Sequence, residues 1–129
     1  MQIVPISKQD IVNRYEQIDI VPTHYFGDDD IYIREVTLPA DSIILGEIHK
    51  YSCMNIVSKG KILVVDVTSG EEVYIEAPFT FKSEAGIQKL AYVLEECVWS
   101  NVIHTNLTDI EEIEDKFLIR GGDNICHLL

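Results

Sequence analysis

The chain has 129 residues, of which 47% are hydrophobic, and a formal net charge of -12 at pH 7. This length suits one domain with its own core and is too short for two. The acidic excess repels phosphate groups, so it argues against nonspecific nucleic-acid binding and anionic membranes, and it is typical of a solvated surface. No run approaches the roughly 18 apolar residues of a membrane span, and no basic and apolar leader opens the chain, so we expect a cytoplasmic protein.

The cysteines give no sign of a covalent or metal-bound framework. Cys53, Cys97 and Cys126 are an odd number, and no two of them have CxxC spacing. This pattern predicts neither a disulfide framework nor a zinc knuckle. Reduced thiols are typical of a cytoplasmic compartment.

The N-terminal part, residues 1–38, predicts a short helix followed by an edge strand. Ser7 is placed to cap the helix, which ends before Val21-Pro22 because the residue before a proline is pushed out of helical geometry. The apolar stripe of this helix repeats at i, i+4 and i+7 and consists of Ile11, Tyr15 and Ile18.

An acidic turn over residues 26–30, FGDDD, leads into the predicted strand Ile31–Leu38. Three consecutive aspartates suggest calcium, but the spaced oxygen ligands and the closing glutamate of an EF-hand loop do not follow them. A solvated turn is therefore the favoured interpretation.

The next segment, residues 39–105, predicts the strands of an antiparallel barrel. Short runs rich in isoleucine, valine and leucine alternate with turn residues about every 7–12 positions, which favours a sandwich or barrel over a βαβ sheet. Tight turns are expected at Lys59-Gly60, where a positive φ is tolerated, and at Glu95-Glu96. The predicted strands are Ser42–His49, Cys53–Val57, Lys61–Val67, Glu72–Glu76, Phe79–Ser83, Gln88–Leu94 and Cys97–Thr105.

A C-terminal helix is predicted within residues 106–120. The T-x-x-E pattern from Thr108 to Glu111 is a capping box, and Gly121-Gly122 should stop the helix. The residues expected to pack against the barrel are Ile110, Ile113 and Phe117. The remaining tail, 121–129, could fray, add an edge strand or bind a partner.

Alternation in the first barrel strand indicates a polar site inside the barrel. Leu45, Glu47 and His49 share one face by the two-residue period of a strand, so we expect them inside, with Ile48 and Lys50 pointing away. An inward imidazole beside a carboxylate would normally be hydrogen-bonded to it. A pair formed by Glu47 and His49 is therefore expected.

The order of elements and several turn residues resemble the cupin superfamily over residues 39–105. The first cupin motif has the form G-x5-H-x-H-x3/4-E-x6-G. With Gly60 as its last glycine, the other motif positions are Asp41 for the first glycine, Glu47 and His49 for the histidines, and Cys53 for the glutamate.

The second cupin motif, G-x5/7-P-x-G-x2-H-x3-N, aligns on Pro78. Gly70 precedes it, Thr80 stands for the second glycine and Ser83 for the histidine. The resemblance implies a single cupin-like domain over 1–129, all-β, with an antiparallel jelly-roll barrel between a short N-terminal helix and a C-terminal helix.

The ligand set departs from these motifs. The resemblance implies Fe, Mn, Ni or Zn held by three histidines and a glutamate, and only His49 is unchanged. Glu47 and Cys53 could supply oxygen and sulfur, a mixed set that suits zinc better than redox iron. Ser83 is a poor ligand, and nothing in the spacing places His104 among the others. No metal or cofactor is therefore expected, and the alternative is a divalent ion such as zinc on His49 and Glu47.

The candidates for lining a pocket are thus Glu47, His49, Cys53, Ser83 and His104, and no residue is assigned a catalytic role. Cys53 and His49 could form a nucleophile and its base, although thiols on the strands of small barrels are usually inert core. Trp99 could line a pocket, although an aromatic residue in an apolar strand usually belongs to the core.

A second resemblance concerns the source of the chain. The runs IHKYSCMNIVSKGKILVV and EAPFTFKSEAG, and the tryptophan strand that ends before an acidic helix, are similar to small cupin-like proteins encoded by tailed bacteriophages. It implies a virus-encoded accessory or virion protein, located in the cytoplasm of a bacterial host or in the virion. No activity follows from it.

Three functions remain open. The first is a non-catalytic module that binds a partner protein or small ligand, which fits the altered ligand set and the acidic surface. The second is a metal-dependent isomerase, epimerase or dioxygenase with His49 and Glu47 at the metal. The third is a metal-free pocket for a nucleotide or sugar, with Lys59, Lys61 and Lys89 as nearby cations.

We also expect a homo-oligomer, most simply a dimer. An open jelly-roll edge needs covering, and a strand added to a neighbouring sheet would cover it. The segments that could supply this strand are Ile31–Leu38, Met1–Ile6 and Ile125–Leu129.

Overall fold

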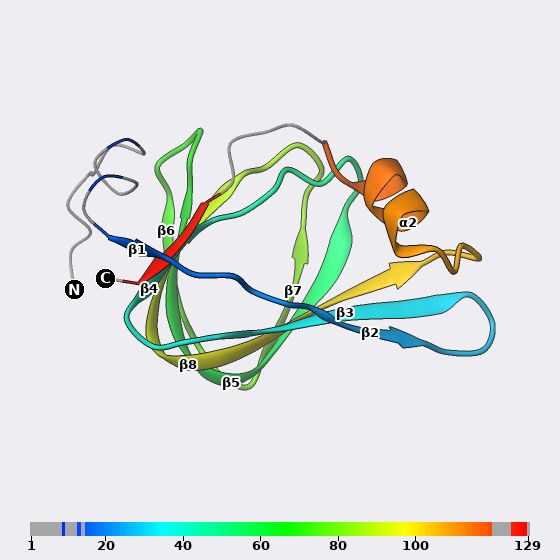
Figure 1. The fold of residues 1–129 in the computed structure, drawn as a ribbon, viewed down its shortest axis with the longest axis horizontal. Helices are drawn as coiled ribbons and strands as arrows, with labels where there is room; N and C mark the ends of the chain where they lie inside the picture. The colour runs from blue at the N-terminus through cyan, green and yellow to red at the C-terminus, as the bar shows by residue number, and fades with distance from the viewer. Residues whose placement is uncertain (1–8, 10–12, 14, 120–124, 129) are drawn as a thin grey trace.

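Antiparallel strands make up most of the computed structural model, which describes residues 9, 13, 15–119 and 125–128 (Figure 1). The predicted all-β class and antiparallel pairing are confirmed. The elements are β1 (Glu16–Gln17), β2 (Thr23–Phe26), β3 (Ile31–Leu38), β4 (Ser42–Leu45), β5 (Cys53–Asp66), β6 (Glu72–Glu76), β7 (Phe79–Ser83), β8 (Lys89–His104), α2 (Ile110–Phe117) and β9 (Ile125–Leu128).

The two longest strands, β5 and β8, form the spine of the barrel. They pair with each other along most of their length. On its other edge β5 pairs first with β7 and then with β6, whereas β8 pairs with β4 through its first half and with β3 through its second. Because each long strand changes partner midway, the sheet wraps around an interior (Figure 1).

Both long strands run through points at which the sequence predicts turns. Gly60 lies within β5 at φ 95°, and Glu95-Glu96 lies within β8. The β5–β8 register shifts around Gly60, as it does at a β-bulge. A Cβ at Gly60 would overlap the backbone carbonyl of Glu96, so glycine is needed for close approach and for its positive φ. The two predicted turns were therefore wrong. Both a bulge and a tight turn favour a glycine with positive φ, so Gly60 fits either one.

The first barrel strand is shorter than predicted. β4 ends at Leu45, and His49 makes only an isolated backbone bridge with Leu118. Between them, the amide of Gly46 donates to the carbonyl of Lys89 at 3.0 Å. The segment after Gly46 then reaches the end of α2, where the amide of Lys50 donates to the carbonyl of Phe117 at 2.7 Å.

The helix α2 differs from the prediction at both ends. Its N-cap is Asp109 and not Thr108, because a carboxylate oxygen of Asp109 accepts from the amides of Glu111 and Glu112. It ends at Phe117, well before Gly121-Gly122, because Leu118 is extended and bridges to His49. The predicted packing face is confirmed: Ile113 is buried with Tyr32 and Ile103, and Ile110 and Phe117 pack against them.

The N-terminal prediction was partly wrong. Ser7 and Ile11 lie outside the described residues, but Glu16–Gln17 form β1, so no helix continues to Ile18. The sequence reasoning also missed β2, which pairs with β3 across the predicted acidic turn. In that turn Asp29 and Asp30 have positive φ, which aspartate tolerates better than most residues.

The C-terminal tail adds a strand, one of the three predicted alternatives. β9 pairs with β4 on one side and β1 on the other. β3 is likewise paired on both sides, with β2 and β8. Neither strand is therefore open for strand addition to a second chain, and Met1–Ile6 lies outside the described residues. The homo-oligomer itself stays a prediction.

The described helical segments include none that is both long enough and apolar enough to span a membrane.

Candidate functional site

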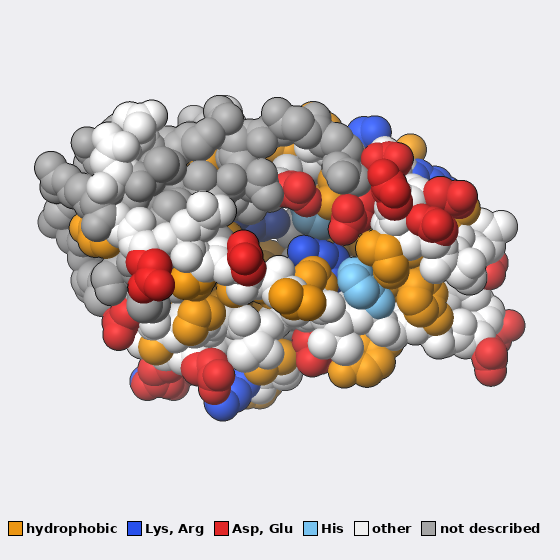
Figure 2. All heavy atoms as spheres, viewed as in Figure 1, with side chains coloured by type: hydrophobic (Ala, Val, Ile, Leu, Met, Phe, Trp, Pro, Cys, Tyr) orange, Lys and Arg blue, Asp and Glu red, His pale blue; other side chains and the backbone are white. Residues whose placement is uncertain are grey.

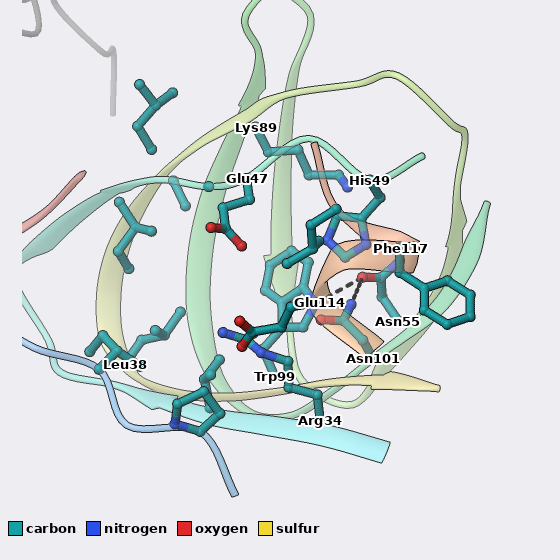
Figure 3. A pocket seen from close by; sticks show the side chains of 18 of the residues that line it. Arg34, Leu38, Glu47, His49, Asn55, Lys89, Trp99, Asn101, Glu114 and Phe117 are labelled. Carbon is teal, nitrogen blue, oxygen red and sulfur yellow. Dashed lines mark hydrogen bonds between the residues drawn. The ribbon is translucent and has the colours of Figure 1, made fainter. Parts of the chain in front are cut away.

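A cavity of about 510 Å³ lies inside the barrel, between the strands and α2. Figure 2 shows the hollow from outside, with cationic and histidine side chains in its depth and carboxylates around it. Glu47, His49 and Lys89 point into the cavity from one side, and Arg34 and Glu114 from the other (Figure 3). The interior of this barrel is therefore partly polar and charged.

The structure places Glu47 and His49 together in the lining of this cavity, with Leu45 beside them. Lys50 is exposed, and its ammonium donates to the backbone carbonyl of Asp115. The expected hydrogen bond between Glu47 and His49 is not among the hydrogen bonds of the described residues. The two side chains share the cavity without forming the expected pair.

His49 is neutral near pH 7, and the cause is its burial near two cations and not a hydrogen bond to Glu47. Burial, followed by the positive charges of Lys89 and Arg34, lowers its pKa from 6.5 to about 4. A carboxylate in close contact would have acted in the opposite direction. The neutral imidazole avoids placing a third cation beside Lys89 and Arg34.

A hydrogen-bond network centred on Asn55 lies along the cavity, although two of the residues predicted to line the cavity, Ser83 and Cys53, are not in its lining. This side chain is 1% exposed, and its amide nitrogen donates to Ser83 Oγ at 2.5 Å. Its carbonyl oxygen accepts from Trp99 Nε1 at 2.9 Å and from Asn101 Nδ2 at 2.7 Å. Ser83 also accepts from Lys89 Nζ at 2.7 Å. This network joins β5, β7 and β8 inside the barrel and holds each polar group in one orientation.

Cys53 and His104 occupy less favourable positions for chemistry. Burial raises the pKa of the Cys53 thiol, whose sulfur lies 3.7 Å from Asn101 Nδ2. A protonated thiol is a poor nucleophile and a poor metal ligand. His104 is exposed at the end of β8, outside the lining of the main cavity, and borders a separate hollow beside Phe117.

These residues do not fit the metal that the cupin motifs imply. In the described part of the chain, no three His, Cys, Asp or Glu side chains are grouped so that they could hold an ion. Cys53 is protonated, and Ser83 is occupied by two donors, Asn55 and Lys89. The motif positions of the glutamate and the second-motif histidine, here Cys53 and Ser83, therefore offer no charged ligand to a metal ion.

Several residues of the cavity were missed by the sequence reasoning or given little weight. Arg34, Asn55 and Asn101 line it, and Lys89 was considered only as a nearby cation. The two-residue period could have identified them. Arg34 alternates in phase with buried Tyr32 and Leu38, and the same spacing joins the two asparagines to buried neighbours on their strands.

Comparison with known proteins identifies the architecture but not the function. No family model matches the chain, and no curated protein matches it. Solved structures do. Ectoine synthase from P. lautus superposes with a TM-score of 0.60 at 13% identity, covering 91% of this chain and 88% of that one.

Two further structures agree. A cupin-2 domain containing protein from Shewanella frigidimarina has a TM-score of 0.53 at 15% identity, covering 77% of this chain and 93% of its own. A conserved protein with a double-stranded β-helix domain from Klebsiella pneumoniae has a TM-score of 0.56 at 13% identity, covering 81% and 95%. This chain therefore has the cupin fold, and the predicted fold is confirmed. At these identities the similarity defines the fold alone.

Proposed function

We propose that this chain is a non-catalytic cupin-fold protein that binds a small organic anion in its barrel without a metal. The observation that carries the proposal is Arg34, whose Nε is buried at the cavity and has no hydrogen-bond partner among the described residues. A buried donor without an acceptor costs about 1–3 kcal/mol, so a ligand that supplies the acceptor would recover that free energy.

The cavity has suitable size and polarity for such a ligand. Its volume of about 510 Å³ is within the range of small-molecule sites. Arg34 and Lys89 supply two positive charges, and guanidinium groups recognise carboxylates well. Glu47 and Glu114 add carboxylate acceptors on the same cavity. We therefore propose a small carboxylic acid that also carries a hydroxyl or amino group, for which Glu47 is the partner.

A binding role is supported over an enzymatic one by the state of the reactive groups. The Cys53 thiol is protonated, and burial leaves the His49 imidazole neutral. Within the described residues no partner orients that imidazole, whereas a catalytic base is normally oriented by a third group. The cavity thus has groups that can hold a ligand but lacks an activated nucleophile.

The other two functions can be ranked against the same geometry. A metal-dependent enzyme requires a ligand set, and the motif positions do not form one. A nucleotide or sugar pocket was suggested by three lysines, but Lys59 and Lys61 are on the surface in ion pairs with Glu96, Glu95 and Glu76. Only Lys89 of the three lines the cavity. The bacteriophage origin and virion role stay predictions from sequence pattern.

Trp99 gives a direct test because it is the only tryptophan and it lines the cavity. Purified protein would be titrated with hydroxy, amino and dicarboxylic acids while Trp99 fluorescence is recorded. We expect at least one acid to change the emission saturably. Arg34→Gln should weaken that binding about tenfold or more, since a charged hydrogen bond is lost. Lys82→Gln, at an exposed ion pair with Glu84, should leave it unchanged.

The proposal fails if no acid in the panel changes the Trp99 emission, or if Arg34→Gln binds as tightly as the wild type. A stoichiometric metal that survives dialysis and is lost in His49→Ala would instead favour the metal-dependent enzyme. Both experiments use the same preparation.

A further inference from the structure

One of the four cupin motif positions, Ser83, is hydrogen-bonded to a lysine side chain, Lys89. Cys53 on β5 and Ser83 on β7 are directly opposite each other in the strand register. These are the positions of the motif glutamate and the second-motif histidine. Lys89, at the start of β8, reaches the same point, because its Nζ donates to Ser83 Oγ at 2.7 Å.

Lys89 also acts on the first motif. Burial is the main cause of the lowered pKa of His49 and of the raised pKa of the Cys53 thiol. The positive charge of Lys89 acts to lower both pKa values, so Lys89 lies within electrostatic range of both groups. Glu47 points into the same cavity from the same side as Lys89 (Figure 3). One ammonium group is thus hydrogen-bonded to one motif position and electrostatically coupled to two others.

We propose that the Lys89 ammonium takes the place of the metal ion, so that this barrel carries a cation tethered to its own chain. The charges of the surrounding groups are consistent with this assignment. A set of three histidines and a glutamate suits a divalent ion. Within the motif set Glu47 is the only carboxylate, while His49, the Cys53 thiol and the Ser83 hydroxyl are neutral, so the set suits a monovalent cation. Burial lowers the pKa of Lys89, and Asp66, its partner on β5, opposes that shift.

A tethered ammonium would differ from a metal in what it can do. It has three N–H donors, of which Ser83 accepts one, and it supplies positive charge and hydrogen bonds but no Lewis-acid or redox chemistry. It also cannot be removed by a chelator. The altered motif residues are then complementary to lysine and need not be remnants of a lost metal site. This inference goes beyond ligand binding, and its test uses no ligand.

The main test restores the motif donors with and without the lysine. One variant carries Cys53→Glu and Ser83→His, and the second carries the same two changes plus Lys89→Ala. Binding of Co²⁺ would be followed by its visible absorption and by metal analysis after dialysis, with circular dichroism and Trp99 emission to verify folding. We expect the triple variant to bind one Co²⁺ at least 100-fold more tightly than the double variant, because the ammonium excludes the ion.

Two results would overturn the inference. Equal Co²⁺ affinity in both variants would show that the ammonium is not at the metal position. Lack of Co²⁺ binding by both folded variants would show that the four positions do not converge on one point. Neither result bears on whether the wild type binds an organic anion, which the Trp99 titration decides.

A single substitution gives a second measurement that does not depend on the multiple variants. Lys89→Ala vacates the ammonium position, and free n-propylammonium should occupy it. We expect n-propylammonium chloride to raise the melting temperature of Lys89→Ala saturably, by at least about 3 °C, and to leave the wild type unchanged. Tetramethylammonium, which has no N–H donor, should have no such effect. An equal response of Lys89→Ala and the wild type, or an equal effect of both salts, would contradict the inference.

Discussion

The two halves of this barrel interior are built on the same strands but differ in kind. One half is apolar, with Val57, Ile62 and Val64 of β5 packed against Val93 and Cys97 of β8. The other half, toward α2, contains the Asn55 network and the charged side chains of the cavity. The comparison shows that β5 and β8, which supply side chains of the apolar core, also carry and position residues of the polar site.

The bulge at Gly60 changes the inward-facing positions of β5. Before it, the buried positions of β5 are odd-numbered, as at Asn55 and Val57, and beyond it Ile62 and Val64 belong to the core. The register shift therefore reverses which side chains of β5 face inward. Gly60 thus determines which side chains of β5 face the interior on either side of the bulge.

The largest effect is expected at this bulge. Gly60→Ala places a Cβ against the carbonyl of Glu96 and puts alanine at φ 95°. Strain and overpacking together should cost about 3–5 kcal/mol in the free energy of unfolding, measured by urea denaturation. Gly70→Ala is the matched control, because φ is 75° there but no atom lies within 4 Å, and it should cost about 1 kcal/mol. Similar costs for both would show that close approach at Gly60 is unimportant.

The polar half should be sensitive to acid through His49. Its pKa is lowered to about 4 from 6.5, so the unfolded chain takes up the proton first as the pH falls. This contribution to stability is complete above about pH 6.5 and is lost toward pH 4, by up to about 3 kcal/mol. Urea denaturation at pH 7 and pH 4 should show a larger loss for the wild type than for His49→Gln. Parallel losses would mean that His49 titrates normally, despite Lys89 and Arg34.

The network in the polar half should respond to loss of its centre. Asn55→Leu leaves Trp99 Nε1, Asn101 Nδ2 and Ser83 Oγ without one partner each. We expect a loss of about 2–3 kcal/mol, seen as a lower melting temperature and a shifted Trp99 emission. Asn106→Leu, at an exposed position, is the control and should change neither. If Asn55→Leu leaves the melting temperature unchanged, the network does not contribute to stability.

The smallest effect is expected outside both halves. The ion pair of Lys59 with Glu96 is short, at 2.7 Å, but its side chains are 61% and 52% exposed. Lys59→Gln should change the free energy of unfolding by less than about 0.5 kcal/mol, because solvent screens exposed charges. A loss above 1 kcal/mol would mean that this pair helps to hold the bulge.

The sequence by itself determined those features that depend on neighbouring residues. Alternation and turn residues predicted the strands Ile31–Leu38, Glu72–Glu76 and Phe79–Ser83 with the bounds that the structure shows. The resemblance to the cupin motifs implied the cupin fold. Local patterns are sufficient here because side-chain period and turn geometry are properties of short segments.

Only the tertiary structure decided how distant segments combine. Whether Gly60 makes a turn or a bulge depends on the strand that pairs with it, and a local pattern cannot distinguish them. Lys89 is paired with Asp66 at the far end of β5 from Cys53, yet its side chain reaches Ser83 on β7. Arg34 lines the same cavity from β3. The state of His49 likewise depends on charges contributed by β3 and β8, since desolvation and electrostatic coupling act through space.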